Sequence, residues 1–471
     1  MTTVDKQKLH RVLSPRTVAV VGDKKSTGYR WLRAMEKFRG KVYSVQIDPN
    51  EVPGIEAMGV PNYQRLMDIP DEVDYVVLAV PRAVAPRVLR DAVEKKVGGV
   101  AMFTSGFAET DTKEGVQLQN EVKELARRNG LVIVGPNCMG VYNPSVGLRF
   151  GAEQPTGFSG PVAFISQSGG HTGSFSLAAH ANGIAVGLAV SFGNGVMLES
   201  VDYLEYFAQD PDTKYIAMYI EGVRDGRRLF RVLRETTPHK PVVVWKGGVS
   251  EAGQRATASH TASLGGAAVI WDAMCRQAGA IQVTSLEELV DVLQALVYLP
   301  PFTGDGVGIT GGSGGQSVSL ADDFSRAGLR VPTLTQASYY RLASFFSLVG
   351  ASYRNPIDLG SNRTEIETIL DVLSQDPNVD IVVMQLTPQA WRQDQSQVEA
   401  QVEALIRHRD HSGKPAAGVL FSPMPLEEAE LLRSLAERLR AVGVPVFPSY
   451  ARAARAIKKA LDYHRFHRAE G

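Results

Sequence analysis

The residues best suited to chemistry lie between positions 246 and 266, where small side chains, hydroxyl groups and glycines surround one imidazole, His260. Ser259 and Thr261 flank this imidazole with hydroxyl groups. Hydroxyl groups and the free amides of glycine-rich segments are donors that suit a negatively charged group on or near an imidazole. The pattern therefore favours His260 as a site of anion chemistry over a solvated loop histidine.

A second candidate segment runs from position 166 to 170, between an apolar run at 161–165 and an expected helix. Glycines and serines before a helix predict an anion-binding nest at its N-terminus. His171 adjoins this nest and is the alternative phosphoryl acceptor, although it lies inside the start of the helix. The residues that we expect to contact phosphate in the two segments are Ser166, Gln167, Ser168, Gly169, Gly170, Gly265 and Gly266.

Glu221 follows directly after an apolar run at 215–220. A carboxylate at the end of a buried strand is costly unless it has a partner. One partner would be Arg224 or Arg227, in a structural salt bridge. The other would be a ring nitrogen of His260, in which case Glu221 fixes the tautomer and stabilises the charged ring.

The elements that must position these residues are short apolar strands that alternate with helical stretches. A strand at 241–245 and a helix at 267–278 bracket the His260 segment, whose small residues predict an exposed loop that can move. Nearer the N-terminus, a lead-in helix at 1–16 precedes strands at 17–21, 41–46, 73–80, 98–104 and 131–134. This alternation predicts doubly wound parallel sheets with ligands at the strand C-termini.

The first of these strands runs into a glycine turn with two cations, Lys24 and Lys25, which would meet phosphates if they are not merely solvated. A Rossmann dehydrogenase is the rival interpretation. It is weakened because Gln46 and Ile47 stand where an acidic ribose ligand is usual.

A proline- and glycine-rich connector at 299–305 predicts a third α/β domain. Its glycine loop at 311–317 is either a degenerate phosphate site or, as we favour, tight packing. The chain ends in a basic amphipathic helix at 450–467, for which we expect a solvated surface. The predicted domains are 1–145, 146–298 and 299–471.

Composition narrows the class of protein. The chain has 471 residues, and its 50 Lys and Arg balance 50 Asp and Glu, which argues against nucleic acid as the main partner. Two cysteines and scattered histidines predict neither a disulfide scaffold nor a metal cluster. Without a signal-peptide core or an apolar run of spanning length, we expect a cytoplasmic protein that does not enter the membrane.

The motifs resemble those of the NDP-forming acyl-CoA synthetases, the ADP-forming relatives of succinyl-CoA synthetase. The resemblance rests on Ser259-His260-Thr261 with its flanking glycines, on the segment ending in Glu221, and on the loops at 105–109 and 135–138. It implies a Rossmann-like CoA-binding domain followed by two flavodoxin-like ligase domains, with His260 as phosphoryl carrier and Glu221 as its orienting partner. One departure is Gly22-Asp23-Lys24, where the family often has Gly-Ala-Ser.

The resemblance also implies a set of contacts to coenzyme A at the strand ends of the first domain. These residues are Gly22, Lys24, Lys25, Ser26, Thr27, Gly28, Val80, Pro81, Ser105, Gly106, Glu109, Asn137 and Cys138.

The implied reaction is acid, CoA and NTP to acyl-CoA, NDP and phosphate, in either direction. The sequence shows no ATP-grasp module, so the resemblance implies an alpha-type subunit whose ATP-grasp partner supplies ATP or ADP and Mg²⁺ in a hetero-oligomer. Two rivals stay open. One is a non-catalytic CoA-binding regulatory module, and the other is an acyl- or carbamoyl-transferring relative of the same fold.

Overall fold

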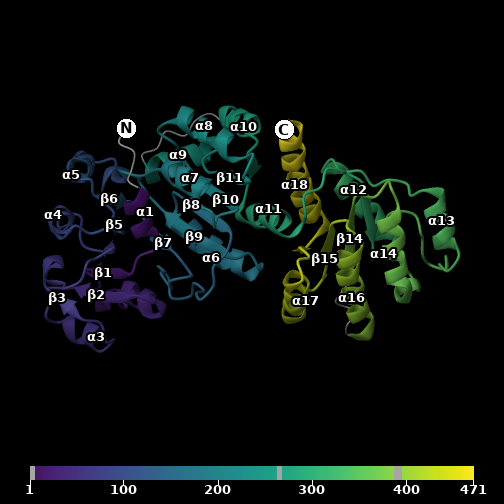
Figure 1. Cartoon of the computed structure of the whole chain (residues 1–471), viewed down its shortest axis with the longest axis horizontal. Coiled ribbons are helices and arrows are strands. Elements are labelled where there is room, and N and C mark those ends of the chain that lie inside the picture. Colours follow the sequence, from purple (N-terminus) through teal and green to yellow (C-terminus); the bar gives the residue numbers. More distant parts are fainter. Residues whose placement is uncertain (1–5, 262–267, 387–394, 471) are drawn as a thin grey trace. The chain divides into compact units, whose positions relative to one another are not determined.

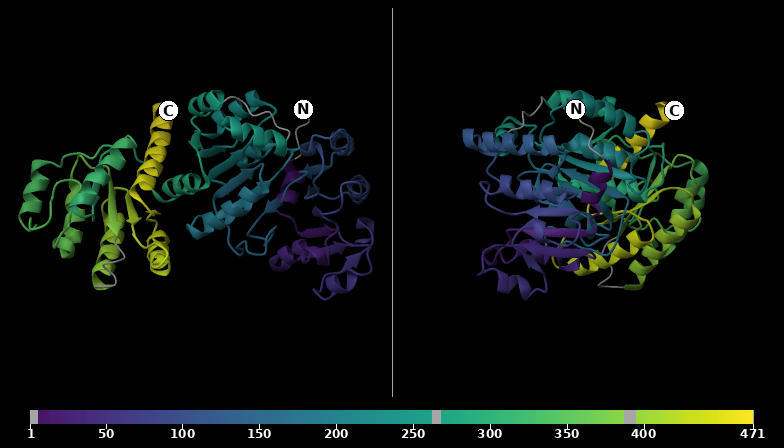
Figure 2. Two further views of the ribbon diagram at one scale, coloured as in Figure 1. Left: turned by 180° about the vertical axis from the view of Figure 1, so that it is seen from behind. Right: turned by 60° about the vertical axis from the view of Figure 1, so that its left-hand side comes forward.

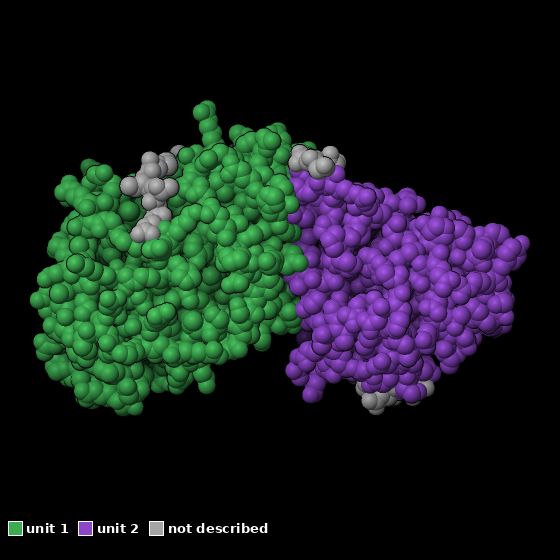
Figure 3. Space-filling view, in the orientation of Figure 1, with its two compact units in different colours: residues 1–286 green, residues 287–471 purple. Residues whose placement is uncertain are grey.

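The computed structural model describes residues 6–261, 268–386 and 395–470, with the side chains at 258–261, 395, 469 and 470 excepted. The chain divides into two compact units, residues 1–286 and 287–471 (Figure 3). Unit 1 contains two six-stranded sheets, and unit 2 contains a four-stranded sheet. The expected architecture of doubly wound α/β sheets is confirmed, while the division into three domains at 145 and 298 stays a prediction.

The first sheet is parallel and has the order β3-β2-β1-β4-β5-β6 (Figure 1). Its strands are short, rich in β-branched residues and mostly buried on both faces, as expected for a sheet between helical layers. The order reverses between β1 and β4, which places the ligand crevice at the carboxyl ends of these strands. The strands are β1 Thr17–Val21, β2 Lys41–Val45, β3 Asn62–Tyr63, β4 Tyr75–Leu78, β5 Gly99–Met102 and β6 Val132–Val134.

Helices pack beside this sheet, as the views in Figure 2 show. They are α1 Lys6–Leu13, α2 Arg30–Ala34, α3 Val52–Glu56, α4 Ala85–Lys95 and α5 Lys113–Asn129, with short 3₁₀ turns η1 Lys25–Thr27, η2 Met35–Lys37, η3 Leu66–Asp68 and η4 Ala108–Thr110.

The second sheet has the order β12-β11-β10-β8-β9-β7, with only β7 antiparallel to its neighbour. Its strands are β7 Gly140–Tyr142, β8 Val162–Ser166, β9 Val186–Ser191, β10 Tyr215–Ile220, β11 Val242–Lys246 and β12 Ile281–Val283. Its helices are α6 Gly169–Ala181, α7 Ser200–Gln209, α8 Gly226–Thr236, α9 Glu251–Thr261 and α10 Ala268–Gln277. Without β7, this is the flavodoxin-like strand order that the sequence predicts.

Backbone hydrogen bonds join the two sheets of unit 1. The amides of Asn194 and Val196 donate to the carbonyls of Pro136 and Gly135 over 3.0 Å each. Gly193 has φ +52°, and a Cβ there would lie 2.3 Å from the Asn137 carbonyl oxygen. The loops that follow β6 and β9 are therefore locked together, so the carboxyl edges of both sheets belong to one body.

Unit 2 has a parallel sheet in the order β13-β14-β15-β16, with single bridges at Arg330 and Ile357. Its strands are β13 Val307–Thr310, β14 Ile381–Leu386, β15 Ala416–Leu420 and β16 Val446–Phe447. Its helices are α11 Leu286–Tyr298, α12 Gly314–Arg326, α13 Gln336–Ala343, α14 Ile366–Gln375, α16 Gln395–His411, α17 Ala429–Ala441 and α18 Tyr450–Glu470, with the 3₁₀ turn η5 Asn362–Glu365.

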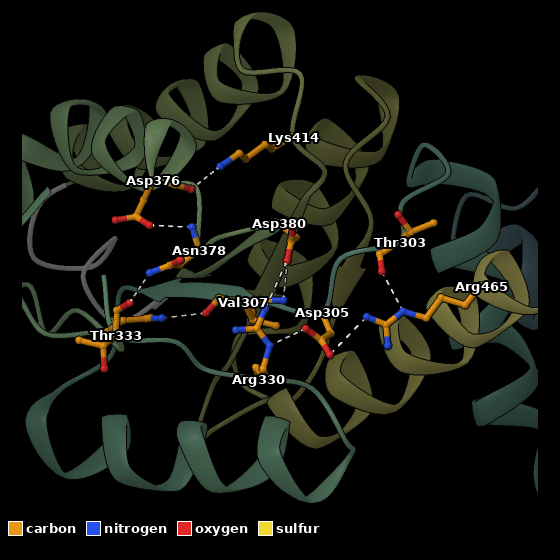
Figure 4. A network of polar contacts seen from close by, with 12 residues as sticks. Thr303, Asp305, Val307, Arg330, Thr333, Asp376, Asn378, Asp380, Lys414 and Arg465 are labelled. Atoms are coloured by element: carbon orange, nitrogen blue, oxygen red, sulfur yellow. Dashed lines mark hydrogen bonds and ion pairs between the residues drawn. The ribbon is translucent and has the colours of Figure 1, made fainter. Parts of the chain in front are cut away.

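A polar network holds the segments at the amino edge of this third sheet (Figure 4). Asp305 accepts from Arg330 over 2.6 Å and pairs with Arg465 at 3.3 Å. Lys414 donates to the Asp376 carbonyl over 2.7 Å, and Asp380 accepts from the Gly306 amide over 2.8 Å. Because each partner belongs to the same unit, these contacts are scaffold interactions.

The prediction of a solvated C-terminal helix is wrong in one respect. α18 buries a row of small and aliphatic residues, including Ile457 and Leu461 at 0% exposure. Arg452 forms a bidentate pair with the buried Asp291 of α11, at 2.6 and 2.8 Å. A helix whose cations pair with acids elsewhere in the fold looks like a solvated basic helix when it is read alone.

Candidate active site

Two adjacent chain segments at the carboxyl edge of the second sheet carry an acid, Glu221, and a base, Lys246. Glu221, after β10, receives a hydrogen bond from the Tyr219 hydroxyl at Oε1 over 3.2 Å. Its Oε2 is buried and has no hydrogen-bond partner among the described residues. A buried carboxylate oxygen without a donor is costly, so Glu221 is poised to accept a further hydrogen bond.

Lys246, at the end of β11, lies beside this acid and is 7% exposed. Its Nζ donates to the Glu221 carbonyl over 2.7 Å and to the Gly247 carbonyl, and it sits 5.3 Å from the centre of the Trp271 ring. Burial lowers the pKa of the Lys246 ammonium, and the Glu221 carboxylate acts against that shift. Lys246 thus ties the ends of β10 and β11 to α10 and places positive charge near Glu221.

Three rings form a wall next to this pair. The His171 ring lies 4.3 Å from Tyr219 and 4.4 Å from Trp245, and these two aromatic rings are 4.7 Å apart. Burial lowers the pKa of His171, and Glu221 again acts in the opposite direction. Desolvation therefore favours a neutral His171 that packs in the wall.

The loop from Ser166 to Gly170 has the expected place before α6. Ser168 is the N-cap of that helix and accepts from the His171 amide over 3.3 Å, while Ser166 Oγ donates to the Ser168 carbonyl over 2.8 Å. Gln167 Oε1 accepts from the amides of Glu221 and Gly222 over 2.5 and 2.9 Å. The loop is therefore braced against the Glu221 segment, and its role in phosphate binding stays a prediction.

The predicted loop around His260 is wrong for residues 251–261, which form α9. Ser250 caps this helix by accepting from the Gly253 amide over 3.1 Å, and Glu251 pairs with Arg255 at 3.0 Å. Nothing in 251–261 breaks a helix other than one glycine, so local capping decides the conformation. His260 lies on the last turn, where its side chain is not described, and Gly265 and Gly266 lie outside the described residues.

α9 packs against η4, the turn at Ala108–Thr110 in the first sheet's loop system. The helix that carries His260 therefore lies against the segment predicted to contact CoA. This is the contact that brings the two predicted parts of the site together within unit 1.

The β1 loop is organised by Asp23, the residue at which the sequence departs from the family pattern. Asp23 is 2% exposed, and its carboxylate accepts from the Lys24 amide, the Thr27 hydroxyl and the Leu32 amide at 2.9–3.2 Å. Burial raises the pKa of Asp23, and these donors oppose the rise. The side chain shapes the turn from within.

Around that turn, the polar positions predicted to meet CoA phosphates face solvent. Gly22 has φ +87°, and a Cβ there would lie 2.6 Å from Val80 Cγ1, so only glycine fits against the β4 loop. The exposed positions are Lys24, Lys25, Ser26, Thr27 and Gly28, and the neighbouring Pro81 and Ser105 are also exposed. A solvent-facing cationic loop after β1 fits a phosphorylated ligand.

The side chains of Glu109 and Cys138 are held within the protein: Glu109 by hydrogen bonds and Cys138 by burial. The Glu109 carboxylate accepts from the amides of Gly106 and Phe107 and from Asn194 Nδ2, the last over 2.6 Å. The Cys138 thiol is buried, and burial raises its pKa to about 12. Asn137 stands next to it at φ +57°. Their contribution to CoA binding stays a prediction.

Across the described residues, no group of three or more His, Cys, Asp or Glu side chains could hold a metal ion. In the same part of the chain, no helix is long and apolar enough to cross a membrane.

Sequence reasoning missed Lys246 and the ring wall. The sequence pattern places Lys246 at the start of a loop and Tyr219 and Trp245 within strands, which gives them no role in a site. The available signal was that Lys246 ends one strand and Glu221 directly follows the adjacent parallel strand, so both charged residues leave the sheet at the same edge.

The fold and these strand-end loops define a CoA-binding domain joined to a ligase domain. The family model described as CoA binding domain matches residues 16–144, and that described as succinyl-CoA ligase like flavodoxin domain matches residues 159–296. Together they cover both sheets of unit 1.

Relatives extend the match over the whole chain. The alpha subunit of ADP-forming acetate–CoA ligase II from Pyrococcus furiosus is 35% identical over 79% of this chain and 80% of its own, and the isoform I alpha subunit is 32% identical over 97% and 98%. The chain spans 63% of the ADP-forming acetate–CoA ligase I of Archaeoglobus fulgidus, at 33% identity over 95% of this chain.

A solved structure has the same fold throughout. The dinucleotide-forming acetyl-coenzyme A synthetase 1 of Ca. Korarchaeum cryptofilum, in complex with phosphate and ADP, matches with TM-score 0.82 and 27% identity over 98% of this chain and 97% of that one. The chain belongs to the ADP-forming acyl-CoA synthetase family, and it corresponds to the family's alpha subunits.

Proposed function

We propose that this chain is the CoA-binding, phosphohistidine-carrying subunit of an NDP-forming acyl-CoA synthetase, an acid–thiol ligase. The reaction joins a carboxylic acid to CoA with conversion of an NTP to NDP and phosphate, and it runs in either direction. The observation that carries the proposal is the buried Glu221 Oε2, which has no hydrogen-bond partner among the described residues. It lies at the sheet edge from which the chain continues into the His260 helix and into the Ser166–Gly170 loop.

In the proposed relay, the terminal phosphoryl group of the NTP moves to a ring nitrogen of His260, and NDP leaves. The carboxylate of the acid then attacks the phosphorus on His260 to give an acyl phosphate and the free imidazole. The CoA thiolate attacks the acyl carbon and releases inorganic phosphate, and the reverse direction runs through the same steps. The Glu221 carboxylate accepts a hydrogen bond from the N–H of the ring, which leaves the other ring nitrogen to attack phosphorus. Lys246 and the α6 N-terminus supply positive potential, since phosphoryl transfer depends mainly on positioning and charge stabilisation.

CoA would lie against the carboxyl ends of the first sheet. The exposed Lys24 and Lys25 would meet its phosphates, and Gly22 would let the loop approach closely. The Ser166–Gly170 loop and the glycine pair Gly265 and Gly266 would receive phosphate. His171 packs in the aromatic wall, so His260 is the better candidate for the acceptor.

The nucleotide and Mg²⁺ would be bound by an ATP-grasp chain, as the alpha-subunit names of the relatives support. The test is reconstitution with Mg²⁺-ATP, CoA and a panel of carboxylic acids. We expect thioester and ADP only when an ATP-grasp chain is added. Turnover by the isolated chain would show a nucleotide site within it. ADP formation by the two chains together that does not depend on CoA would favour a regulatory module.

A further inference from the structure

Unit 1 has an apolar groove that the proposed reaction does not use. It lies between α8 and α10, which pack side by side (Figure 1). The cavity at its centre has a volume of about 440 Å³. The α8–α10 groove, as we name it, has Arg227 and Phe230 of α8 on one side and Ile270, Trp271 and Met274 of α10 on the other.

The rim of the groove on α10 is exposed and apolar. Val269 is 76% exposed and Ile270 is 67% exposed, on adjacent positions of the first helical turn. Large aliphatic residues that stand together beside an apolar cavity mark an interaction site rather than ordinary surface. These two residues come directly after the segment that links α10 to the His260 helix.

The opposite rim is cationic. Arg227, Arg231 and Arg234 recur at spacings of four and three along α8, so they share one exposed face, and none forms an ion pair with a described residue. Two nearby arginines are paired: Arg224, before α8, with Glu199, and Arg228, on α8, with Asp202 and Glu205. The unpaired face therefore offers complementary charge to an acidic surface.

The floor of the groove connects to the proposed catalytic residues. Trp271 of α10 lines the cavity, and its ring also forms a cation–π contact with the Lys246 ammonium. The Nζ of Lys246 donates a hydrogen bond to the Glu221 carbonyl. An occupant of the groove would therefore press on the residue that supports Glu221.

We infer that the α8–α10 groove is the docking surface for the ATP-grasp partner chain, which would insert apolar side chains between the helices and set carboxylates against Arg227, Arg231 and Arg234. The inference rests on the proposed function. A phosphoryl group on His260 reaches a nucleotide on another chain only if that chain binds close to α9 and α10. An apolar centre with a charged rim is the usual composition of such an interface.

The experiment uses the full-length chain and an ATP-grasp chain from the same genome, with affinity measured by calorimetry. The double variant Val269→Ser/Ile270→Ser should weaken the complex at least about 10-fold, as for the loss of central apolar anchors. Arg227→Glu should weaken it by a similar factor and make binding less sensitive to salt. The matched controls, Val318→Ser on α12 and Arg87→Glu on α4, should leave the affinity unchanged.

The failures are distinguishable. If the wild-type chains form no complex, the partner in the proposed function is wrong, and the docking site falls with it. If the complex forms and both groove variants bind with wild-type affinity, only the docking site is wrong. Phenylacetate is the small-molecule probe: saturable quenching of Trp271 fluorescence by phenylacetate, lost in the double variant, would make the groove an acid-binding pocket and overturn the inference.

Discussion

The carboxyl edges of the second and third sheets repeat one plan, strand, glycine loop and helix, yet they hold different chemistry. In unit 1, β11 ends at a buried ammonium, and β10 is followed by Glu221, whose Oε2 has no hydrogen-bond partner among the described residues. In unit 2, Gly311 packs under β14, and the Ser313–Gln316 capping box closes the helix start. The same local pattern thus places charged side chains at one edge and a packed glycine with a capped helix start at the other.

The largest effect should come from the unpartnered acid. Glu221→Gln keeps an oxygen for the Tyr219 hydroxyl but weakens the acceptor for an imidazole N–H. Phosphorylation should slow about 10²–10³-fold, the usual cost of losing one preorganised stabilising group. The measurement is the rate of protein labelling from radiolabelled ATP with the partner chain present.

The matched control is Asp358→Asn, which changes a buried acid beside the glycine loop of unit 2. Its labelling rate should equal that of the wild type. Equal slowing of both variants would mean that the two edges do not differ in function.

The glycine loop of unit 2 should respond in stability alone. Gly311 has φ +106°, and a Cβ there would lie 2.4 Å from the Gln385 carbonyl oxygen. Gly311→Ala should therefore lower the free energy of unfolding by roughly 2–4 kcal/mol. Gly315→Ala, with no atom within 4 Å, should be neutral or slightly stabilising. Chemical denaturation measures both, and a tolerated Gly311→Ala would refute the packing role.

One buried lysine and one half-buried lysine sharpen the comparison further. Lys246 and Lys414 each donate to a backbone carbonyl over 2.7 Å, and burial lowers the pKa of each ammonium. Only Lys246 lies at the carboxyl edge next to Glu221. Lys246→Met should slow phosphorylation about 10-fold, or ~1.4 kcal/mol, and Lys246→Arg should restore part of it.

Lys414→Met should lower only the unfolding free energy, by about 0.5–1.5 kcal/mol, since it removes one of the two hydrogen bonds that the Asp376 carbonyl accepts, the other coming from the Val379 amide. Loss of activity in Lys414→Met, with Lys246→Met active, would reverse the assignment of the two edges.

The smallest effect is a pH dependence of unit 2. Burial lowers the pKa of His408 to about 4, with Asp371 opposing and Lys414 assisting the shift. The unfolded chain then binds this proton more readily than the folded chain, so stability falls as pH drops below about 6.5, by up to ~1.4 kcal/mol per pH unit. His408→Gln should flatten this slope in denaturation curves from pH 7 to 5. An unchanged slope would contradict the burial of a neutral imidazole.

Much of the fold could be predicted because buried parallel strands are recognisable in the sequence as apolar runs. The bounds of β1 and β10 agree with the sequence prediction, and His171 lies at the start of α6 as expected. Two-residue strands such as β3 and β16 were not predicted, because so short a run carries no periodicity.

The site was predictable only in outline. Glu221 stood out as an acid after a strand, but the choice between a salt bridge and a free acceptor needed the fold, which pairs Arg224 with Glu199 instead. The helix at 251–261 was missed because small residues favour both loops and capped helices. Asp23 has a structural role that only its contacts to Lys24 and Leu32 disclose.

The most direct test of the account is the position of the phosphoryl group. Full-length wild-type, His260→Ala and His171→Ala chains would be incubated with the ATP-grasp chain and radiolabelled ATP, and the acid-labile, base-stable label on each would be measured and mapped by mass spectrometry. The account predicts label on His260 in the wild type and in His171→Ala, and none in His260→Ala. Label that survives in His260→Ala and disappears in His171→Ala would contradict it.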